Sequence, residues 1–313
     1  MKIAFQMDPL ESINVKGDSS FALMLEAQAR GYDIYEYQVE ALTYDGGDLF
    51  ASTARQVKVQ RDGSNHFTVL DETALDLASD VDVVWLRQDP PFDVGYITAT
   101  YLLERLEGQT LVVNDPKSVR DAPEKLFVLD FARFMPPTMI TRDLASLREF
   151  HARHGDIVLK PLHGKGGEGV FRVGPEGRNL AALAEMFTEA MDEPFIAQAF
   201  LPDVSAGDKR IILVDGEVAG AINRIPGEGE FRSNLVAGGT AHKVGLTERE
   251  EEICAALRPE LKQRGLLFTG IDVIGGYLTE INVTSPTGIV VMDEFNGTNT
   301  PGMIWDVIEA KLA

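Results

Sequence analysis

Apolar and polar residues alternate along the chain in a pattern that changes once, near residue 120. Before that point, short apolar runs of strand length are separated by stretches with apolar residues every three or four positions. The pattern predicts strands at 3–7, 33–39, 82–88 and 110–115 and helices at 21–31 and 98–108. Because strands that alternate with helices usually pair in parallel, we expect an α/β domain with a parallel sheet. Two alternating stretches, 54–60 and 66–70, are typical of a hairpin.

The turn-forming sequences NDP at 114–116 and DAPEK at 121–125 mark a boundary, and a mixed pattern of helices and strands follows. Helices are predicted at 124–132, 143–154, 180–191, 247–264 and 303–312. A strand is predicted at 157–162, and two long strands, KRIILVDG and EVAGAINRI, are predicted to meet at a turn at Asp215–Gly216. We therefore expect a second domain after the parallel-sheet domain.

Charge is the feature of the composition that most restricts function. The 313 residues include 49 Asp and Glu against 29 Lys and Arg, a formal net charge of −20. This balance argues against nucleic acid and anionic membranes as partners, because both need a basic surface. The single cysteine, Cys254, lies in a helical pattern, so we expect it to be buried and the protein to be cytoplasmic. We expect neither a signal peptide nor a transmembrane helix.

The segment TEINVTSP at 279–286 carries two polar oxygen ligands on one strand face. Glu280 and Asn282 are two residues apart, and successive residues of a strand alternate between its faces. Asp272 lies eight residues before Glu280 on the preceding predicted strand. Magnesium prefers a few carboxylate oxygens together with phosphate and water, so these three residues form a candidate metal site.

Register decides whether the three groups can meet. A plain two-residue turn at Gly275–Gly276 would pair residue 272 with residue 279 and would place Asp272 on the face opposite Glu280. We therefore predict that a bulge or an odd-numbered loop shifts the register by one, so that Asp272 lies across from Glu280.

A glycine-rich loop, HGKGGEGV at 163–170, follows the strand that ends near Lys160. Glycines let backbone amides approach a phosphate, although a flexible hairpin turn explains this loop equally well. Lys125 and Lys160 would suit the charge of a polyphosphate, but taken singly each is better explained as a surface lysine. Arg210 lies in a predicted strand and Arg224 in its partner, where arginine could bind phosphate or carboxylate or be ordinary surface charge.

Residues 226–241 contain five glycines and little periodicity, which is unusual for a connection of this length. Arg232 and Asn234 lie within this segment and could reach a substrate carboxylate. We expect a lid that is mobile in the free protein and closes over a reactive intermediate, with a disordered surface insertion as the alternative.

These pieces occur in an order that resembles the ATP-grasp superfamily and, more closely, the bacterial glutathione synthetases. The resemblance rests on EK at 124–125, LKP at 159–161, the glycine-rich loop, DKR at 208–210 and GIDVIGGYLTEINVTSP at 270–286. It is extended by RQDPPFD at 87–93, YLLE at 101–104, IPGEGEFRSNLVAGG at 225–239 and NVTSPTG at 282–288. The resemblance implies an N-terminal α/β substrate-binding domain at 1–123 with a parallel sheet. It also implies an ATP-grasp domain at 124–313 with two α+β lobes, a lid lobe at about 124–198 and a C-terminal lobe at about 199–313.

The resemblance also implies roles for individual residues. Contacts with ATP would come from Lys125, Lys160, Gly164, Gly166, Gly167, Gln198, Ala199, Phe200, Leu201 and Asp208. Mg²⁺ or Mn²⁺ would be held by Asp272, Glu280 and Asn282, and Arg210 would stabilise the phosphoryl group during transfer. The other substrates would be bound by Arg87, Arg224, Arg232, Asn234, Ser285, Pro286 and Thr287.

The reaction implied is ligation of glycine to γ-glutamylcysteine through an acyl phosphate, giving glutathione, ADP and phosphate. The resemblance further suggests a homo-oligomer, either a dimer or a tetramer. Two alternatives remain at this point: another ATP-grasp carboxylate–amine ligase, similar to D-alanine–D-alanine ligase, and a nucleotide-binding module without turnover.

Overall fold

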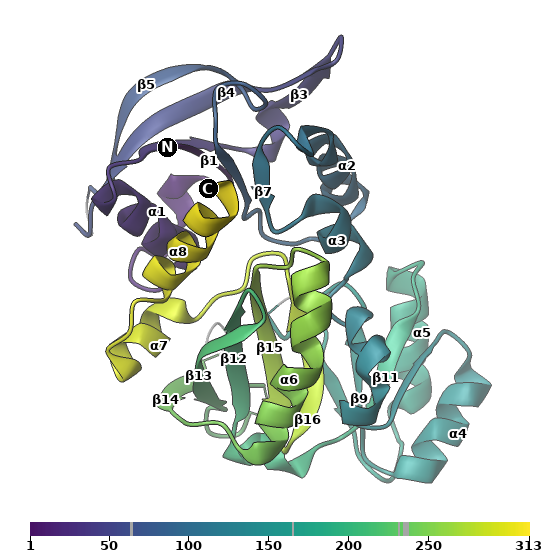
Figure 1. Cartoon of the computed structure of the whole chain (residues 1–313). Coiled ribbons are helices and arrows are strands. Elements are labelled where there is room, and N and C mark those ends of the chain that lie inside the picture. The colour runs from purple at the N-terminus through teal and green to yellow at the C-terminus, as the bar shows by residue number, and fades with distance from the viewer. Residues whose placement is uncertain (63–64, 165, 231, 234–237) are drawn as a thin grey trace.

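The computed structural model describes residues 1–62, 65–164, 166–230, 232–233 and 238–313. Its strands form three sheets, of seven, four and five strands, with helices packed on their faces (Figure 1). The seven-stranded sheet lies at the top of Figure 1, the five-stranded sheet lies below it, and the four-stranded sheet lies at the lower right. In the described part of the chain, no helix has the length and apolar character needed to cross a bilayer.

The N-terminal sheet is mixed, because the predicted parallel strands are joined by antiparallel strands that include both strands of the predicted hairpin. Its strands are β1 (Lys2–Gln6), β2 (Asp33–Tyr37), β3 (Leu42–Asp45), β4 (Asp48–Val59), β5 (Phe67–Asp76), β6 (Val83–Leu86) and β7 (Leu111–Val113). β1, β2, β6 and β7 pair in parallel, as expected, whereas β4 pairs antiparallel with β2, β3 and β5. β3 and β4 are joined by a turn of two residues, Gly46 and Gly47, which can connect only antiparallel neighbours.

Helices cover both faces of this sheet. α1 (Ser19–Ala29) packs on one face together with the C-terminal helix α8 (Thr300–Leu312), and α2 (Val94–Leu103) and α3 (Pro116–Asp121) lie on the other side (Figure 1). Each of the three N-terminal helices begins after an aspartate whose side chain accepts a hydrogen bond from the first turn: Asp18, Asp93 and Asp115. Because Asp93 caps α2, this helix begins four residues before the predicted start at 98.

The two other sheets are antiparallel. The four-stranded sheet has the order β10-β9-β11-β8 and consists of β8 (Thr138–Thr141), β9 (Ile157–Pro161), β10 (Phe171–Val173) and β11 (Phe195–Ala199), with α4 (Leu144–His154) and α5 (Leu180–Ala190). The five-stranded sheet has the order β14-β13-β12-β15-β16 and consists of β12 (Asp208–Val214), β13 (Glu217–Ile225), β14 (Thr240–Lys243), β15 (Phe268–Ile274) and β16 (Tyr277–Asn282). It is accompanied by α6 (Glu248–Gln263) and α7 (Ile289–Asn296).

One predicted helix is wrong. Residues 124–132 do not form an α-helix; a 3-10 helix at Phe127–Phe134 stands in their place, with a break at Phe131. Two prolines follow at 136 and 137, and the residue before a proline is disfavoured in the helical region, which agrees with the extended conformation of Met135 at the end of the segment. The strand β14 and the helix α7 also have no counterpart among the predictions.

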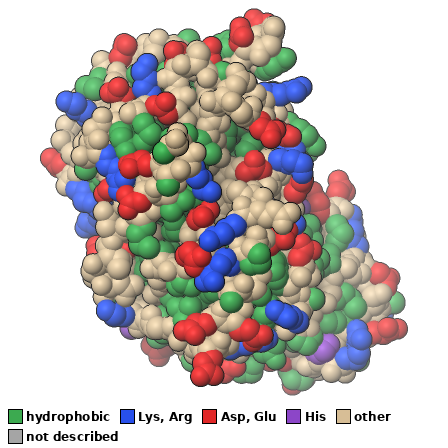
Figure 2. Space-filling model, in the orientation of Figure 1, with side chains coloured by type: hydrophobic (Ala, Val, Ile, Leu, Met, Phe, Trp, Pro, Cys, Tyr) green, Lys and Arg blue, Asp and Glu red, His purple; other side chains and the backbone are tan. Residues whose placement is uncertain are grey.

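The charge excess is distributed over the surface. On the face shown in Figure 2, Asp and Glu side chains are interspersed with Lys and Arg and do not gather into one patch. Cys254 is buried in α6, as expected, at 2% exposure.

Candidate functional site

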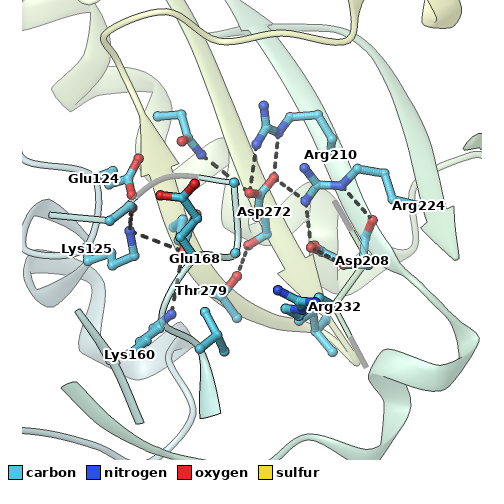
Figure 3. Close-up of a pocket in the computed structure, with 18 of the residues that line it drawn as sticks. Glu124, Lys125, Lys160, Glu168, Asp208, Arg210, Arg224, Arg232, Asp272 and Thr279 are labelled. Atoms are coloured by element: carbon cyan, nitrogen blue, oxygen red, sulfur yellow. Dashed lines mark hydrogen bonds and ion pairs between the residues drawn. The ribbon is translucent and has the colours of Figure 1, made fainter. Parts of the chain in front are cut away.

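A cavity of about 690 Å³ opens between the four-stranded and five-stranded sheets. Strands β9 and β11 line it on one side, β12, β13, β15 and β16 line it on the other, and loops of the N-terminal domain and the glycine-rich segment complete its rim. The cavity walls include charged side chains from both sheets, which Figure 3 shows facing the same space.

The hairpin β15–β16 has the shifted register that the sequence analysis predicts. Ile274 pairs with Tyr277 across the Gly275–Gly276 turn, but the register then shifts and Asp272 pairs with Glu280. Thr279 occupies the bulge, and its hydroxyl donates a hydrogen bond of 3.1 Å to the backbone carbonyl of Asp272. Asp272, Glu280 and Asn282 all line the cavity as a result.

Asp272 is held by two arginines. Arg210 donates to both carboxylate oxygens, at 2.5 and 2.8 Å, and Arg224 lies 2.9 Å from Oδ1 (Figure 3). Burial alone would raise the pKa of Asp272, but the two guanidinium groups outweigh it and hold the pKa well below its usual value. Arg224 also pairs with Asp208 at 2.6 Å, and burial raises the pKa of that carboxyl group.

Glu280 faces two lysines across the cavity. The Nζ atoms of Lys125 and Lys160 lie 3.7 and 3.6 Å from Glu280 Oε1. Burial would raise the pKa of Glu280, but these two cations outweigh it and lower the pKa. Burial lowers the pKa of Lys160, whereas for Lys125 the attraction of Glu280 and Glu124 outweighs burial and raises the pKa. Both lysines are buried, so the simpler explanation of each as a surface residue is wrong.

The oxygen ligands at this site suit a divalent cation that also binds phosphate. Within the described residues, no three His, Cys, Asp or Glu side chains converge as they would in a site built from protein alone. Glu280 makes only long contacts with its lysines, and the amide nitrogen of Asn282 lies 3.5 Å from Asp272. Carboxylate and amide oxygens on one wall of a cavity, completed by phosphate oxygens, are a donor set that fits Mg²⁺.

Part of the cavity lining consists mostly of apolar residues. This part is formed by Val158, Gln198, Ala199, Phe200, Leu201, Val204 and Ile274. Gln198 is buried, and its amide donates to Thr138 Oγ1 at 2.8 Å, so this side chain is fixed against the strand. Apolar side chains that enclose a cavity in this way are the environment in which a flat aromatic base binds.

The glycine-rich loop reaches over the lysine side of the cavity. The carbonyl of Gly164 accepts a hydrogen bond of 2.7 Å from Lys125, and a Cβ atom at Gly164 would lie 2.5 Å from the ring of Pro161. Gly166 and Gly167 both have positive φ values, of 62° and 81°, which other residues rarely adopt. Glycine is therefore required by the course of the chain here, and Lys165 lies outside the described residues.

Some of the predicted substrate-binding residues line the cavity and others do not. Arg232 lines the cavity, together with the turn Ser285, Pro286 and Thr287. Arg87 does not line it: this side chain is buried behind the turn, where it donates to the Pro286 carbonyl at 3.1 Å. Asn234 lies outside the described residues, as does part of the expected lid.

Several cavity residues were missed by sequence reasoning. Glu124 lies beside Lys125 and Glu280, and burial together with Glu280 raises its pKa. Val158 is two residues before Lys160 on the same strand, so the alternation of strand faces could have indicated it. For Thr279 the predicted register shift was itself the signal, because some residue of β16 had to occupy the bulge.

The fold is shared with ATP-grasp ligases of known structure. Two solved structures with this fold are D-cycloserine synthetase DcsG, with a TM-score of 0.66 and 17% identity, and the ATP-grasp ligase PsnB in complex with a precursor peptide and AMPPNP, with a TM-score of 0.64 and 17% identity. The first comparison covers 98% of this chain and 100% of the other chain, and the second covers 99% and 98%.

Sequence comparison identifies the family. The model of the prokaryotic glutathione synthetase N-terminal domain matches residues 1–120, and the model of its ATP-grasp domain matches residues 124–297. The glutathione synthetase of Rhodopseudomonas palustris is 56% identical over 313 residues, covering 100% of this chain and 99% of the relative. That of Agrobacterium fabrum is 52% identical over 309 residues, covering 99% and 96%. The chain belongs to the prokaryotic glutathione synthetase family.

Proposed function

We propose that the chain ligates glycine to γ-glutamylcysteine at the expense of ATP, producing glutathione, ADP and phosphate. The observation that carries this proposal is identity above 50% with glutathione synthetases over the full length of the chain. The cavity supports it, because it combines a slot for an aromatic base with buried cations and carboxylates.

ATP binds with its adenine in the apolar slot formed by Gln198, Ala199, Phe200 and Leu201. Asp208 stands at the ribose side, and its pairing with Arg224 fixes its position. Lys125 and Lys160 bind phosphate oxygens under the glycine-rich loop, where Gly164, Gly166 and Gly167 allow the backbone to approach. Because both lysines are buried, their charges are not screened by water and act strongly on a bound polyphosphate.

Asp272, Glu280 and Asn282 would hold Mg²⁺, or Mn²⁺ in its place. A divalent cation bound there supplies positive charge that neutralises the β- and γ-phosphate oxygens of ATP. The ATP-grasp ligase PsnB, which has the same fold, is known in complex with Mg and ADP, and this supports the proposal.

The chemistry requires positioning and charge neutralisation from the protein. An oxygen of the cysteinyl carboxylate attacks the γ-phosphorus, the bond to ADP breaks, and an acyl phosphate forms. Arg210 lines the cavity and is held by Asp272 and, from Nη1, by the Thr287 carbonyl at 3.4 Å, and its charge stabilises the phosphoryl group in transfer. The glycine amine then attacks the acyl carbon and phosphate leaves, so no protein nucleophile is needed.

The other substrates occupy the end of the cavity near the N-terminal domain. The peptide and glycine carboxylates are bound by Arg232, Asn234, Ser285, Pro286 and Thr287. Arg87 supports the γ-glutamylcysteine site. Arg224 forms ion pairs with both Asp208 and Asp272 and contributes to substrate binding from there. We place the substrate-binding domain at 1–123 and the ATP-grasp domain at 124–313. Within the ATP-grasp domain, the lid lobe ends and the C-terminal lobe begins near residue 198. We place the enzyme in the cytoplasm as a homo-oligomer, either a dimer or a tetramer.

The test is product identification. Purified protein is mixed with ATP, magnesium, γ-glutamylcysteine and glycine, and ADP and glutathione are measured by chromatography and mass spectrometry. ADP release should require magnesium and γ-glutamylcysteine, and glutathione should require glycine as well. Equal turnover with D-alanine as the only amino-acid substrate would overturn the proposal.

A further inference from the structure

The segment that follows β13 meets the cavity at one buried serine. Among the described residues of 226–241, Ser233 is buried, at 4% exposure, whereas Glu228, Gly229 and Glu230 are exposed. The Ser233 hydroxyl donates a hydrogen bond of 2.8 Å to Asp208 Oδ2. Because buried polar side chains are nearly always hydrogen-bonded, this bond fixes the place at which the segment meets the cavity.

The Asp208 carboxylate has one oxygen that is held by the protein and one that is not. Oδ2 accepts a hydrogen bond of 2.6 Å from Arg224 in addition to the bond from Ser233. Oδ1 is buried and has no hydrogen-bond partner among the described residues. Asp208 lines the cavity, and an unpaired buried oxygen is unfavourable, so a hydroxyl on a bound ligand would stabilise it by donating to Oδ1.

Arg224 connects this carboxylate to Asp272. It pairs with Asp208 and also lies 2.9 Å from Asp272 Oδ1 (Figure 3). The register explains the first pair, since Asp208 and Arg224 lie opposite each other on β12 and β13. Loss of the Ser233 hydroxyl would leave both ion pairs in place, so a substitution at Ser233 can test its bond alone.

The residue next to Ser233 also lines the cavity. Arg232 bonds the Glu230 carboxylate at 3.0 Å, within its own segment, so this bond does not hold the segment against the sheet. The bond from Ser233 to Asp208 at the start of β12 does hold it there. The position of the Arg232 guanidinium in the cavity therefore depends on the Ser233 hydroxyl.

We propose that Ser233 is a positioning residue that couples nucleotide binding to peptide binding. The inference rests on the proposed function, in which Asp208 stands at the ribose of ATP and Arg232 binds a substrate carboxylate. A ribose hydroxyl donates to Asp208 Oδ1, and because a carboxylate is planar, this bond also fixes the direction of Oδ2. Oδ2 then holds Ser233, and with it Arg232, in the binding position. Such coupling is reciprocal, so each ligand strengthens the binding of the other by the same factor.

Ser233→Ala tests the coupling in binding measurements that need no turnover. The dissociation constant for γ-glutamylcysteine is measured by calorimetry in the absence of nucleotide and with saturating magnesium and AMPPNP, an ATP analogue with nitrogen between its β- and γ-phosphorus atoms. In the unmodified protein, AMPPNP should lower this constant at least about fivefold. In Ser233→Ala the constant without nucleotide should be unchanged, and AMPPNP should lower it less than about twofold.

Ser205→Ala is the matched control. It removes a hydroxyl by the same substitution, but Ser205 is exposed, bonds the Pro202 carbonyl of its own turn at 2.9 Å and does not line the cavity. This variant should keep the full coupling. Both variants should show a cooperative thermal transition, because the ion pairs of Asp208 persist in each.

Two nucleotides locate the contact on the ligand. 2′-DeoxyATP and 3′-deoxyATP each lack one ribose hydroxyl, and KM for each is compared with KM for ATP. The unmodified enzyme should have a KM at least about fivefold higher for the analogue that lacks the hydroxyl bonded to Asp208. Ser233→Ala should raise KM for ATP and leave KM for that analogue unchanged, because the contact is already missing.

The outcomes distinguish this inference from the proposed function. If the unmodified protein makes glutathione but shows no coupling, or if Ser233→Ala keeps the coupling, the role of Ser233 is wrong and the function stands. Equal KM values for the three nucleotides, or a Ser233→Ala protein without a thermal transition, would overturn the role as well. If no glutathione forms from γ-glutamylcysteine at all, the proposed function itself fails.

Discussion

Lys160 is a residue whose environment the sequence alone does not reveal: it is predicted to be a surface lysine, but it is buried. A lysine within an apolar strand is unfavourable unless it is paired, and its partner, Glu280, comes from a strand 120 residues later in the chain. Lys125 approaches the same carboxylate from a third segment. Two buried lysines thus meet Glu280 and Glu124 at one point of the cavity, inside a chain whose total charge is −20.

Glu280→Gln tests the central residue of this cluster. The change keeps the shape of the side chain and removes its charge, so we expect the loss of most ligase activity, at least 100-fold in kcat. Folding should persist, because Lys125 also bonds the Gly164 carbonyl and Glu124. Activity is measured as ADP release and folding by circular dichroism during heating.

The control for this variant is Glu217→Gln, an exposed residue at the start of β13 that does not line the cavity, which should retain full activity. If Glu280→Gln shows no cooperative thermal transition, Glu280 is a structural residue and its assignment to the metal site fails.

Cys254 has a pH dependence that follows from its burial. Burial, reinforced by Glu250, raises the pKa of the thiol from 9.0 to about 12. The folded state then holds its proton more tightly than the unfolded chain does. The associated stability is fully present below pH 9 and is lost as the pH rises from 9 toward 12.

We therefore expect the free energy of unfolding to fall more steeply between pH 8.5 and about 10 in the unmodified protein than in Cys254→Ala, as measured by urea unfolding. At pH 8 a thiol reagent should label native Cys254 only as fast as the protein unfolds. Rapid labelling without unfolding, or parallel stability curves for the two proteins, would contradict the burial of this thiol.

At the scale of elements, the hairpin β15–β16 carries the most information about the site. The turn at Gly275 and Gly276 uses positive φ values of 57° and 79°, as a two-residue hairpin requires. Such a turn alone would leave Asp272 and Glu280 on opposite faces, and the bulge at Thr279 corrects this. Successive side chains of a strand point to opposite faces, so Asp272 and Glu280 can share a face only if the register shifts by one residue. This shift could therefore be predicted from the sequence.

Alanine substitutions in this turn should have unequal effects. Both positions have positive φ, which costs an alanine about 1 kcal/mol. At Gly275 the new Cβ would also lie 2.5 Å from Asp203 Oδ2, whereas at Gly276 the nearest atom is Arg249 Cγ at 3.3 Å. We expect Gly275→Ala to lose at least about 1 kcal/mol more than Gly276→Ala in urea unfolding.

Asp203→Gly provides the matched background, because it removes all three Asp203 side-chain atoms that the new Cβ would meet, namely Oδ2, Cγ and Cβ. In that background the two alanine substitutions should cost nearly the same. A persistent difference would place the cause in the turn itself and not in its contact with Asp203.

At the scale of the whole molecule, Asn114 joins the N-terminal sheet to the five-stranded sheet. Its side chain, which is 3% exposed, donates to the carbonyls of Phe268 and Val283 at 2.7 Å each and accepts from the backbone of Phe268 at 2.8 Å. At the opposite end of the chain, Trp305 of α8 donates to the Leu23 carbonyl at 3.0 Å and anchors the C-terminus on the first domain.

Asn114→Ala should destabilise the entire protein. Three hydrogen bonds are lost and their backbone partners stay buried, so we expect a loss of about 3 kcal/mol in the free energy of unfolding, measured with guanidinium. Asn14→Ala, in an exposed loop, should change it by less than about 1 kcal/mol. An Asn114→Ala protein as stable as this control would show that the two sheets are held together by their apolar contacts alone.

The sequence by itself determined the features that depend on local periodicity and on the order of motifs. Parallel strands between helices, the glycine turns, the need for a shifted register near Thr279 and the family resemblance could all be derived before any coordinates. These features arise from residues within about ten positions of one another, or from their order along the chain, so no knowledge of distant contacts is needed.

Only the tertiary structure decided which charges meet. The pairing of Lys160 with Glu280, the position of Arg87 behind the Pro286 turn and the return of α8 to the first domain join residues more than 100 positions apart. The energy of a buried charge depends on its partner and on the exclusion of water, and neither is encoded near that residue in the sequence. The antiparallel strands β3 to β5 extend the N-terminal sheet for the same reason, since edge pairing is decided by the neighbouring strand in space.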